Sequence, residues 1–138
     1  YTLECKRLGK ASAGWVFNEN YSERGVLRFI STDPSYAKGR SSAAMIGYIQ
    51  DMPPSDVLTE VNTFAQARDI PSLKMAATAW SKKSTTRLTN HFKRDFDAGE
   101  FCLNHVWVDL RHCTFQSNLG KKNETTAPKK KKKAARKK

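Results

Sequence analysis

The chain has 138 residues, 38% of them hydrophobic, and a formal net charge of +12. This length suits one domain with a hydrophobic core and is too short for two ordinary domains. The sequence contains no run of about twenty apolar residues and no signal-peptide pattern, so we expect a soluble cytoplasmic protein without a membrane partner.

The elements predicted in the first half of the chain begin with a strand. Apolar and polar residues alternate over residues 1–8, which indicates a half-buried strand with Glu4 and Lys6 on its polar face. Residues 9–14 are small and polar and predict a loop. An asparagine cap followed by an apolar side at helical spacing predicts a helix over residues 18–30.

The second half of the chain predicts one more helix and three strands. A nearly continuous apolar run at residues 43–49 is typical of a strand buried on both faces. Two prolines open a helix over residues 53–68, whereas residues 69–84 are ambiguous and residues 73–80 within them are compatible with a short helix. Residues 85–92 and 100–110 resemble the strands of an antiparallel hairpin. This order predicts an α/β or α+β domain with a mixed sheet.

Most of the net positive charge, +9 of +12, belongs to a C-terminal tail. Residues 121–138 hold ten of the 25 lysines and arginines and a single acidic residue. Because this segment has almost no apolar surface to bury, we expect a disordered tail after a folded domain at residues 1–120. Basic runs bind polyanions by counterion release, whereas a solubilising, localisation or engineered tail is the alternative interpretation. The tail lysines predicted to contact nucleic acid are Lys129, Lys130, Lys131, Lys132 and Lys133.

The sequence indicates structural, and not catalytic or metal-binding, roles for the three cysteines and two of the tryptophans. Cys5, Cys102 and Cys113 are odd in number and lack C-x-x-C spacing, so neither a disulfide framework nor a zinc site is indicated. The first two lie in strand-like apolar stretches and are expected to be reduced core residues. Trp15 and Trp107 are likewise assigned to packing.

The segment Glu4-Cys5-Lys6 carries a pattern that suits phosphodiester chemistry. Residues i and i+2 of a strand project from the same face, so the carboxylate and the ammonium lie side by side. A carboxylate can bind Mg²⁺, and an adjacent lysine can orient an attacking water. The alternative is a same-face ion pair worth only about 0.2–1 kcal/mol.

This segment, continued by Arg7 and Leu8, resembles the catalytic segment of the PD-(D/E)xK, or restriction-endonuclease-like, nucleases, and in particular a group of such proteins from bacteria and their phages. The resemblance implies a restriction-endonuclease-like mixed sheet flanked by helices. The other matching residues lie within residues 1–110 and are Tyr21, Gly25, Val26, Arg28, Phe29, Tyr36, Ala37, Met45, Ile46, Gly47, Tyr48, His91, Arg94, Leu103 and His105.

The resemblance also implies roles for the residues of the motif. Glu4 would be a ligand to Mg²⁺ or Mn²⁺, Lys6 would position the water, and the backbone carbonyl of Cys5 would be a second metal ligand. The family pattern has an aspartate on the preceding strand, and this sequence offers none upstream of Glu4. Either the chain is a fragment, or another residue substitutes, or the domain is inactive; we favour a fragment because Tyr1 already belongs to a predicted strand.

Histidines and clustered basic residues are the remaining candidates. His91 and His105 are either substrate contacts, members of a network around the site, or hydrogen-bonded structural residues. Arg24 and Arg28 are four apart on one predicted helix face and suit phosphate contacts, with a solvated face as the alternative. A second basic cluster is interleaved with Trp80 and Phe92, which either stack a base or belong to the core; its members are Lys82, Lys83, Arg87, Lys93 and Arg94.

The leading hypothesis is a metal-dependent endonuclease-type domain that hydrolyses DNA phosphodiester bonds and is inactive if it is a fragment. The partner is nucleic acid, DNA in preference to RNA, and a homodimer is compatible with this function. The alternative is a non-catalytic nucleic-acid-binding protein anchored by its lysine-rich tail, and a third hypothesis is a structural or inhibitory partner of a larger complex. The resemblance implies a bacterial or phage-encoded protein, with phage defence as its biological setting.

Overall fold

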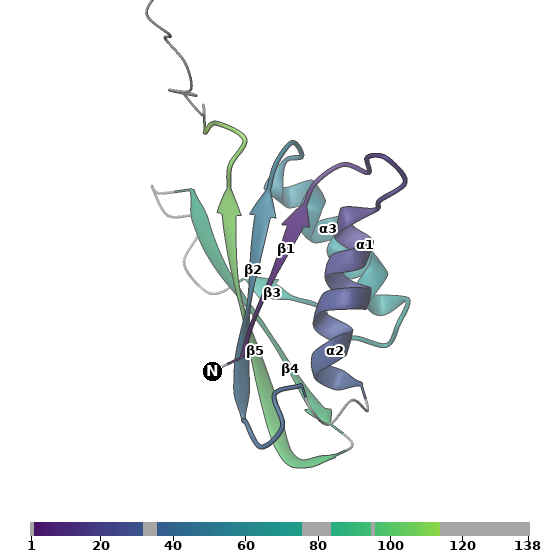
Figure 1. Cartoon of the computed structure of the whole chain (residues 1–138), viewed down its shortest axis with the longest axis vertical. Helices are drawn as coiled ribbons and strands as arrows, with labels where there is room; N and C mark the ends of the chain where they lie inside the picture. Colours follow the sequence, from purple (N-terminus) through teal and green to yellow (C-terminus); the bar gives the residue numbers. More distant parts are fainter. Residues whose placement is uncertain (1, 32–35, 76–83, 95, 114–138) are drawn as a thin grey trace, which may run out of the picture.

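The computed structural model describes residues 2–31, 36–75, 84–94 and 96–113 (Figure 1). Several predictions fall outside these residues. They concern the disordered tail with Lys129, Lys130, Lys131, Lys132 and Lys133, the lysines Lys82 and Lys83, and Trp80.

The described chain contains all of the helices and strands that the sequence predicts with a definite type. The elements are β1 (Leu3–Leu8), α1 (Phe17–Tyr21), the π-helical turn η1 (Ser22–Val26), α2 (Leu27–Ile30), β2 (Ser42–Ile49), α3 (Pro54–Gln66), β3 (Lys74–Met75), β4 (Thr85–Arg94) and β5 (Asp97–Asp109). In the ambiguous region the structure has the short strand β3 at the start of the segment for which a helix is one interpretation, and residues 76–80 of that segment lie outside the described residues. β5 begins before the predicted strand because the hairpin connection is shorter than expected.

The strands form one five-stranded mixed sheet in the order β1-β2-β5-β4-β3. β1, β2 and β5 are parallel, whereas β4 pairs antiparallel with β5, and β3 antiparallel with β4. The parallel pair β1 and β2 is joined through α1, η1 and α2, as parallel neighbours require a crossover. The α/β class with a mixed sheet is therefore confirmed, and β1 lies at one edge of the sheet.

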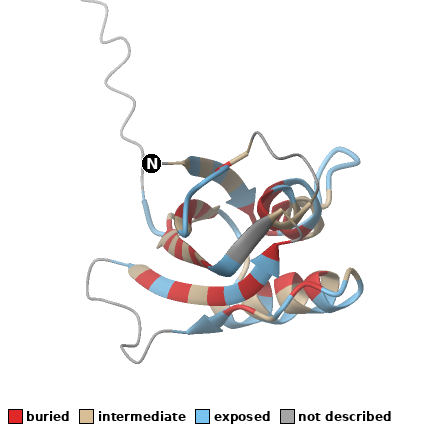
Figure 2. Cartoon of the chain, turned by 90° about the horizontal axis from the view of Figure 1, so that it is seen from below, coloured by how far each residue is buried: buried red, intermediate tan, exposed pale blue. Residues whose placement is uncertain are grey.

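The helices pack on one face of the sheet (Figure 1). Alternate residues of the central strands are buried beneath them, including Met45, Leu103 and Trp107, and the alternation is visible as colour bands along the strands in Figure 2. In the described part of the chain the opposite face carries no helix, and Ile46 and Tyr48 on that face are only half-buried. The prediction that this strand is buried on both faces therefore holds on the outer face at Ala44 and is wrong there at Ile46 and Tyr48.

Two glycines let the helix and the strands approach closely. A Cβ at Gly25 would lie 2.5 Å from Cε of Met45 and 3.7 Å from Cγ of Lys6. A Cβ at Gly47 would lie 2.5 Å from Cδ1 of Leu8. Gly25 belongs to the π-helical turn η1, a feature that is frequent at functional sites.

A chain of buried hydrogen bonds crosses the core. Nε1 of Trp107 donates to the Tyr21 hydroxyl over 3.0 Å, and this hydroxyl lies 2.8 Å from Nδ1 of His105. Since the indole can only donate, the hydroxyl proton is left for Nδ1, and Nε2–H of His105 donates to Oδ1 of Asn90 over 3.0 Å. The Asn90 amide donates in turn to the carbonyl of Pro71. Burial lowers the pKa of His105 to about 3, so its ring is neutral.

Two residues assigned to the core are exposed instead. Cys5 points away from the helices because Glu4, Lys6 and Leu8, at the other parity of β1, face them. Trp15 is 51% exposed, in the loop before α1. Cys102 is half-buried, Cys113 is exposed, and the assignment of Trp107 to the core is confirmed.

Candidate functional site

Glu4 and Lys6 lie side by side on the helix-facing side of β1, as the strand alternation predicts. Nζ of Lys6 is 2.6 Å from Oε1 of Glu4, and their side chains are 26% and 14% exposed. The lysine stem lies beneath η1, where a Cβ at Gly25 would be at ordinary contact distance, 3.7 Å, from its Cγ. The pair is thus held in one geometry at the edge of the sheet.

Two further donors surround the Glu4 carboxylate. The Tyr36 hydroxyl donates a short hydrogen bond to Oε2, and Nη1 of Arg28 lies 3.4 Å from both carboxylate oxygens. The Arg28 guanidinium lies 4.2 Å above the centre of the Tyr36 ring, which packs edge-on against Phe29. Sequence reasoning had included Tyr36 only as a matching residue and missed its contact with Glu4, because the two are 32 positions apart.

The electrostatics of this cluster keep Glu4 ionised. Burial alone would raise the pKa of Glu4, but hydrogen bonds from Lys6 and Tyr36 and the charges of Lys6 and Arg28 outweigh it, so the pKa lies below its ordinary value of 4.5. Burial and the neighbouring carboxylate raise the pKa of Tyr36 to about 12, so it remains a donor. One carboxylate therefore faces two cations, and the cluster is net positive.

The Cys5 carbonyl lies on the free edge of the sheet. The carbonyls of Thr2 and Leu8 accept hydrogen bonds from Ala44 and Gln50. Because the backbone groups of successive strand residues point to opposite sides, the carbonyl of Cys5 points away from β2. It is therefore not used by the pairing of β1 with β2 and remains open to a ligand.

The oxygen donors at this edge suit a hard cation in kind. Within the described ranges no group of three His, Cys, Asp or Glu side chains is placed to hold a metal ion. Mg²⁺ is often held by only one or two carboxylates, with waters and substrate phosphates completing its six ligands. The Glu4 carboxylate and the Cys5 carbonyl are oxygen donors of the kind that Mg²⁺ prefers, and a site built on them would take its other ligands from water and substrate.

The two helix arginines flank Lys6 on different sides. Arg28 reaches Glu4 and Tyr36, whereas the guanidinium of Arg24 lies 5.9 Å from the centre of the Trp15 ring. Both side chains come from the helix that covers β1. They are therefore gathered near the Glu4 and Lys6 pair, although each has a different aromatic neighbour.

The basic residues of β4 lie elsewhere. Arg87 and Lys93 are exposed, and they alternate with buried residues of β4, so they lie on the open face of the sheet. His91 shares that face, with Nε2 3.7 Å from Sγ of Cys102 and Nδ1 3.8 Å from Glu100. These three side chains are not gathered with Glu4.

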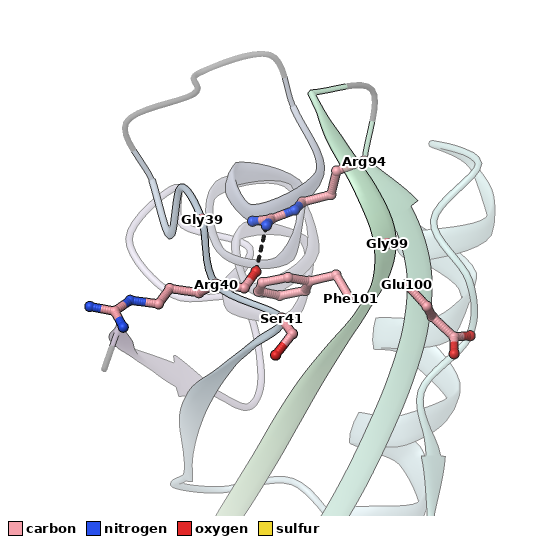
Figure 3. A pocket seen from close by; sticks show the side chains of 7 residues that line it. All are labelled: Gly39, Arg40, Ser41, Arg94, Gly99, Glu100 and Phe101. Carbon is pink, nitrogen blue, oxygen red and sulfur yellow. Dashed lines mark hydrogen bonds between the residues drawn. The ribbon is translucent and has the colours of Figure 1, made fainter.

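Arg94 is the last residue of β4; it is buried and holds a loop (Figure 3). Nη2 donates to the Arg40 carbonyl over 2.6 Å, Nη1 donates to the Ala37 carbonyl over 3.2 Å, and the guanidinium lies 4.0 Å from the centre of the Phe101 ring. Ala37 follows Tyr36 directly, so Arg94 helps to position the loop that brings the Tyr36 hydroxyl to Glu4. Its burial removes it from the surface on which nucleic acid was expected.

His105, the other histidine candidate, belongs to the buried hydrogen-bond chain. It is fully buried between Tyr21 and Asn90, and its contacts are to these two side chains. Of the interpretations open from the sequence, the position favours a hydrogen-bonded structural residue.

Comparison with known proteins adds no family or relative. No protein-family model matches the sequence, and searches of curated proteins and of solved structures found no significant match. None of the helices in the described ranges has the length and apolar character needed to cross a membrane. The functional argument therefore rests on the residues and their geometry.

Proposed function

We propose that this chain is a nuclease-type domain with a restriction-endonuclease-like sheet, which hydrolyses phosphodiester bonds of DNA with the help of Mg²⁺ or Mn²⁺. The observation that supports it best is the Glu4 and Lys6 pair, 2.6 Å apart on an edge strand that opens a β-α-β unit. The resemblance of this segment to PD-(D/E)xK nucleases agrees with that placement.

Each residue of the cluster has a role in this proposal. Glu4 and the Cys5 carbonyl would hold the ion, which when bound stabilises the charge developing on the phosphate. Lys6 is fixed by its short contact with Glu4 and uses its remaining N–H groups to orient the attacking water. Tyr36 holds the carboxylate in place through its hydroxyl.

Arg28 is the residue best suited to receive the substrate phosphate. Its contact with Glu4 is long, at 3.4 Å, and its side chain is 48% exposed, so little holds it to the carboxylate. A phosphate offers the guanidinium a bidentate, charge-assisted contact. Binding of DNA would therefore draw Arg28 away from Glu4, so that each carboxylate oxygen keeps its hydrogen bond from Lys6 or Tyr36 and loses its contact with Arg28.

A specific observation favours a second candidate, a non-catalytic nucleic-acid-binding protein. Both oxygens of Glu4 already accept hydrogen bonds, from Lys6 and from Tyr36. A structural ion pair within a net positive surface has the same appearance. In this alternative the lysine-rich tail supplies most of the affinity, and Glu4 has no part in it.

Cleavage of supercoiled plasmid DNA tests the proposal. The full chain is compared with its Lys6→Ala and Glu4→Ala variants, with Mg²⁺, with Mn²⁺ and with a chelator. Lys74→Ala is the matched control, since Lys74 is exposed on β3 at the opposite edge of the sheet. We expect metal-dependent nicking that falls at least about 100-fold in the two site variants and is unchanged in the control. Absence of nicking with either metal, or equal nicking by Lys6→Ala, would contradict the proposal.

A further inference from the structure

A hollow of about 320 Å³ opens beside Lys6, between β1, the start of α1 and the loop that precedes it. Because Lys6 is one of its lining residues, the hollow adjoins the Glu4 and Lys6 pair. Its lining residues are Lys6, Arg7, Trp15, Phe17, Asn20 and Arg24. The volume is at the lower end of the range for small-molecule sites and is large enough for a nucleobase.

The lining combines cations with aromatic faces and includes no carboxylate. The guanidinium of Arg7 lies 4.5 Å from the centre of the Phe17 ring, and that of Arg24 lies 5.9 Å from the Trp15 ring. Among the described residues Trp15 is one of the few large apolar side chains that are exposed. Aromatic rings interleaved with arginine and lysine are the chemistry by which single strands are bound, through base stacking and phosphate contacts.

A tight turn fixes Trp15 at the rim of this hollow. Ser12 and Trp15 exchange two backbone hydrogen bonds of 2.9 Å. Between them, Ala13 and Gly14 have φ values of 49° and 78°, as in a type I′ turn. Because a non-glycine residue rarely adopts a positive φ, the turn at Ala13 is held by its surroundings. The indole therefore presents its exposed surface from an anchored backbone.

We propose that this hollow binds one unpaired nucleotide of a single strand, with its base stacked on Trp15 and its flanking phosphates on Arg7 and Arg24. A base within a duplex is covered on both faces by its neighbours and cannot stack on a side chain unless it is extruded. The site therefore selects single strands or unpaired ends. This inference rests on the proposed function only in placing the bound nucleotide next to the bond that is cut.

Binding of a short oligonucleotide without divalent metal tests the inference. The probe is a labelled single-stranded oligothymidylate of about six nucleotides, compared with a labelled duplex long enough to stay fully paired under the assay conditions, and fluorescence anisotropy reports the affinity of the full chain. We expect Trp15→Ala to weaken single-strand binding about 5- to 150-fold, since stacking on one aromatic ring contributes that much. Trp15→Phe should retain most of the affinity, and duplex binding should be unchanged in both variants.

Two matched controls lie on β3, at the other edge of the sheet. Met75 is 45% exposed, close to the exposure of Trp15, and Lys74 is also exposed. Met75→Ala should change single-strand affinity by no more than about twofold. Arg24→Ala should weaken single-strand binding more than Lys74→Ala does, because Arg24 lines the hollow and Lys74 does not.

The outcomes separate this inference from the proposed function. Equal affinity of the chain and Trp15→Ala for the single strand would overturn the inference, and so would an equal loss for single strand and duplex. A chain that never cuts DNA but shows the Trp15-dependent preference retains this inference and fails the proposed function. A chain that cuts DNA but lacks the preference retains the function and fails the inference.

Discussion

Replacing Tyr21 with phenylalanine removes one oxygen from the buried hydrogen-bond chain and leaves the ring in place. That oxygen accepts from Nε1 of Trp107 over 3.0 Å and lies 2.8 Å from Nδ1 of His105. All three side chains are buried, at no more than 1% exposure. The substitution therefore leaves two buried polar groups without a partner while hardly changing the packing.

The expected loss of stability follows from those two groups. Each unpaired buried donor or acceptor costs about 1–3 kcal/mol, so for the two groups together we expect the free energy of unfolding to fall by about 2–6 kcal/mol. For a domain of this size such a loss lowers Tm by roughly 10 °C or more. The effect is large because, in this series of hydrogen bonds, the Tyr21 hydroxyl is the partner of both Nε1 of Trp107 and Nδ1 of His105.

Urea denaturation and thermal melting of the full chain measure the effect. Tyr48→Phe is the matched control, since Tyr48 lies half-buried on the open sheet face and its hydroxyl has no partner among the described residues. The control should change stability by no more than about 0.5 kcal/mol. A loss below that value for Tyr21→Phe, or equal losses for both variants, would refute the reasoning.

Three further predictions concern pH, close packing and the buried arginine. Burial lowers the pKa of His105 from 6.5 to about 3, so below pH 6.5 the unfolded chain binds a proton that the folded chain does not. The free energy of unfolding, measured in urea, should therefore fall by up to about 1.4 kcal/mol per pH unit as the pH is lowered from 6.5 toward 5. A flat profile over this range would contradict a neutral His105 ring. Gly25→Ala should lower the free energy of unfolding by about 1–3 kcal/mol because the new Cβ would meet Met45. Gly99→Ala is its control, since a Cβ at Gly99 meets nothing within 4 Å. Equal melting temperatures of the two variants would argue against the contact with Met45. Arg94→Leu leaves the Arg40 carbonyl without its donor and removes one of the two donors to the Ala37 carbonyl, so it should destabilise the fold by about 1–3 kcal/mol in urea. Affinity for DNA should be nearly unchanged, and a selective loss of that affinity would return Arg94 to the binding surface.

The order of elements and the geometry of the Glu4 and Lys6 pair could be predicted from the sequence, because both follow from local periodicity. Alternation places residues of a strand on two faces, but it does not say which face is inward when each face has both apolar and polar members. In β1 the inward face carries Glu4 and Lys6, so Cys5 is outward.

The residues that pair with Glu4 on the inward face of β1 could not be predicted from the sequence, because they are remote from Glu4 along the chain. Tyr36 and Arg28 reach Glu4 through a loop and a helix whose positions depend on the whole fold. Trp15 gave no periodic signal, since it lies in a short turn and not in a helix or strand. Residues in such turns are the hardest to assign to core or surface from a single sequence.

The most direct test of the central claim measures DNA binding and DNA cleavage on the same samples of the wild-type chain and the Lys6→Ala variant. The account predicts that cleavage in the presence of Mg²⁺ or Mn²⁺ is lost while affinity for DNA changes little, because Lys6 acts on the attacking water and most of the positive charge lies elsewhere. Cleavage that survives the substitution, or wild-type chain that binds DNA in a salt-dependent way and does not cut it, would contradict the account and identify Glu4 and Lys6 as a structural ion pair.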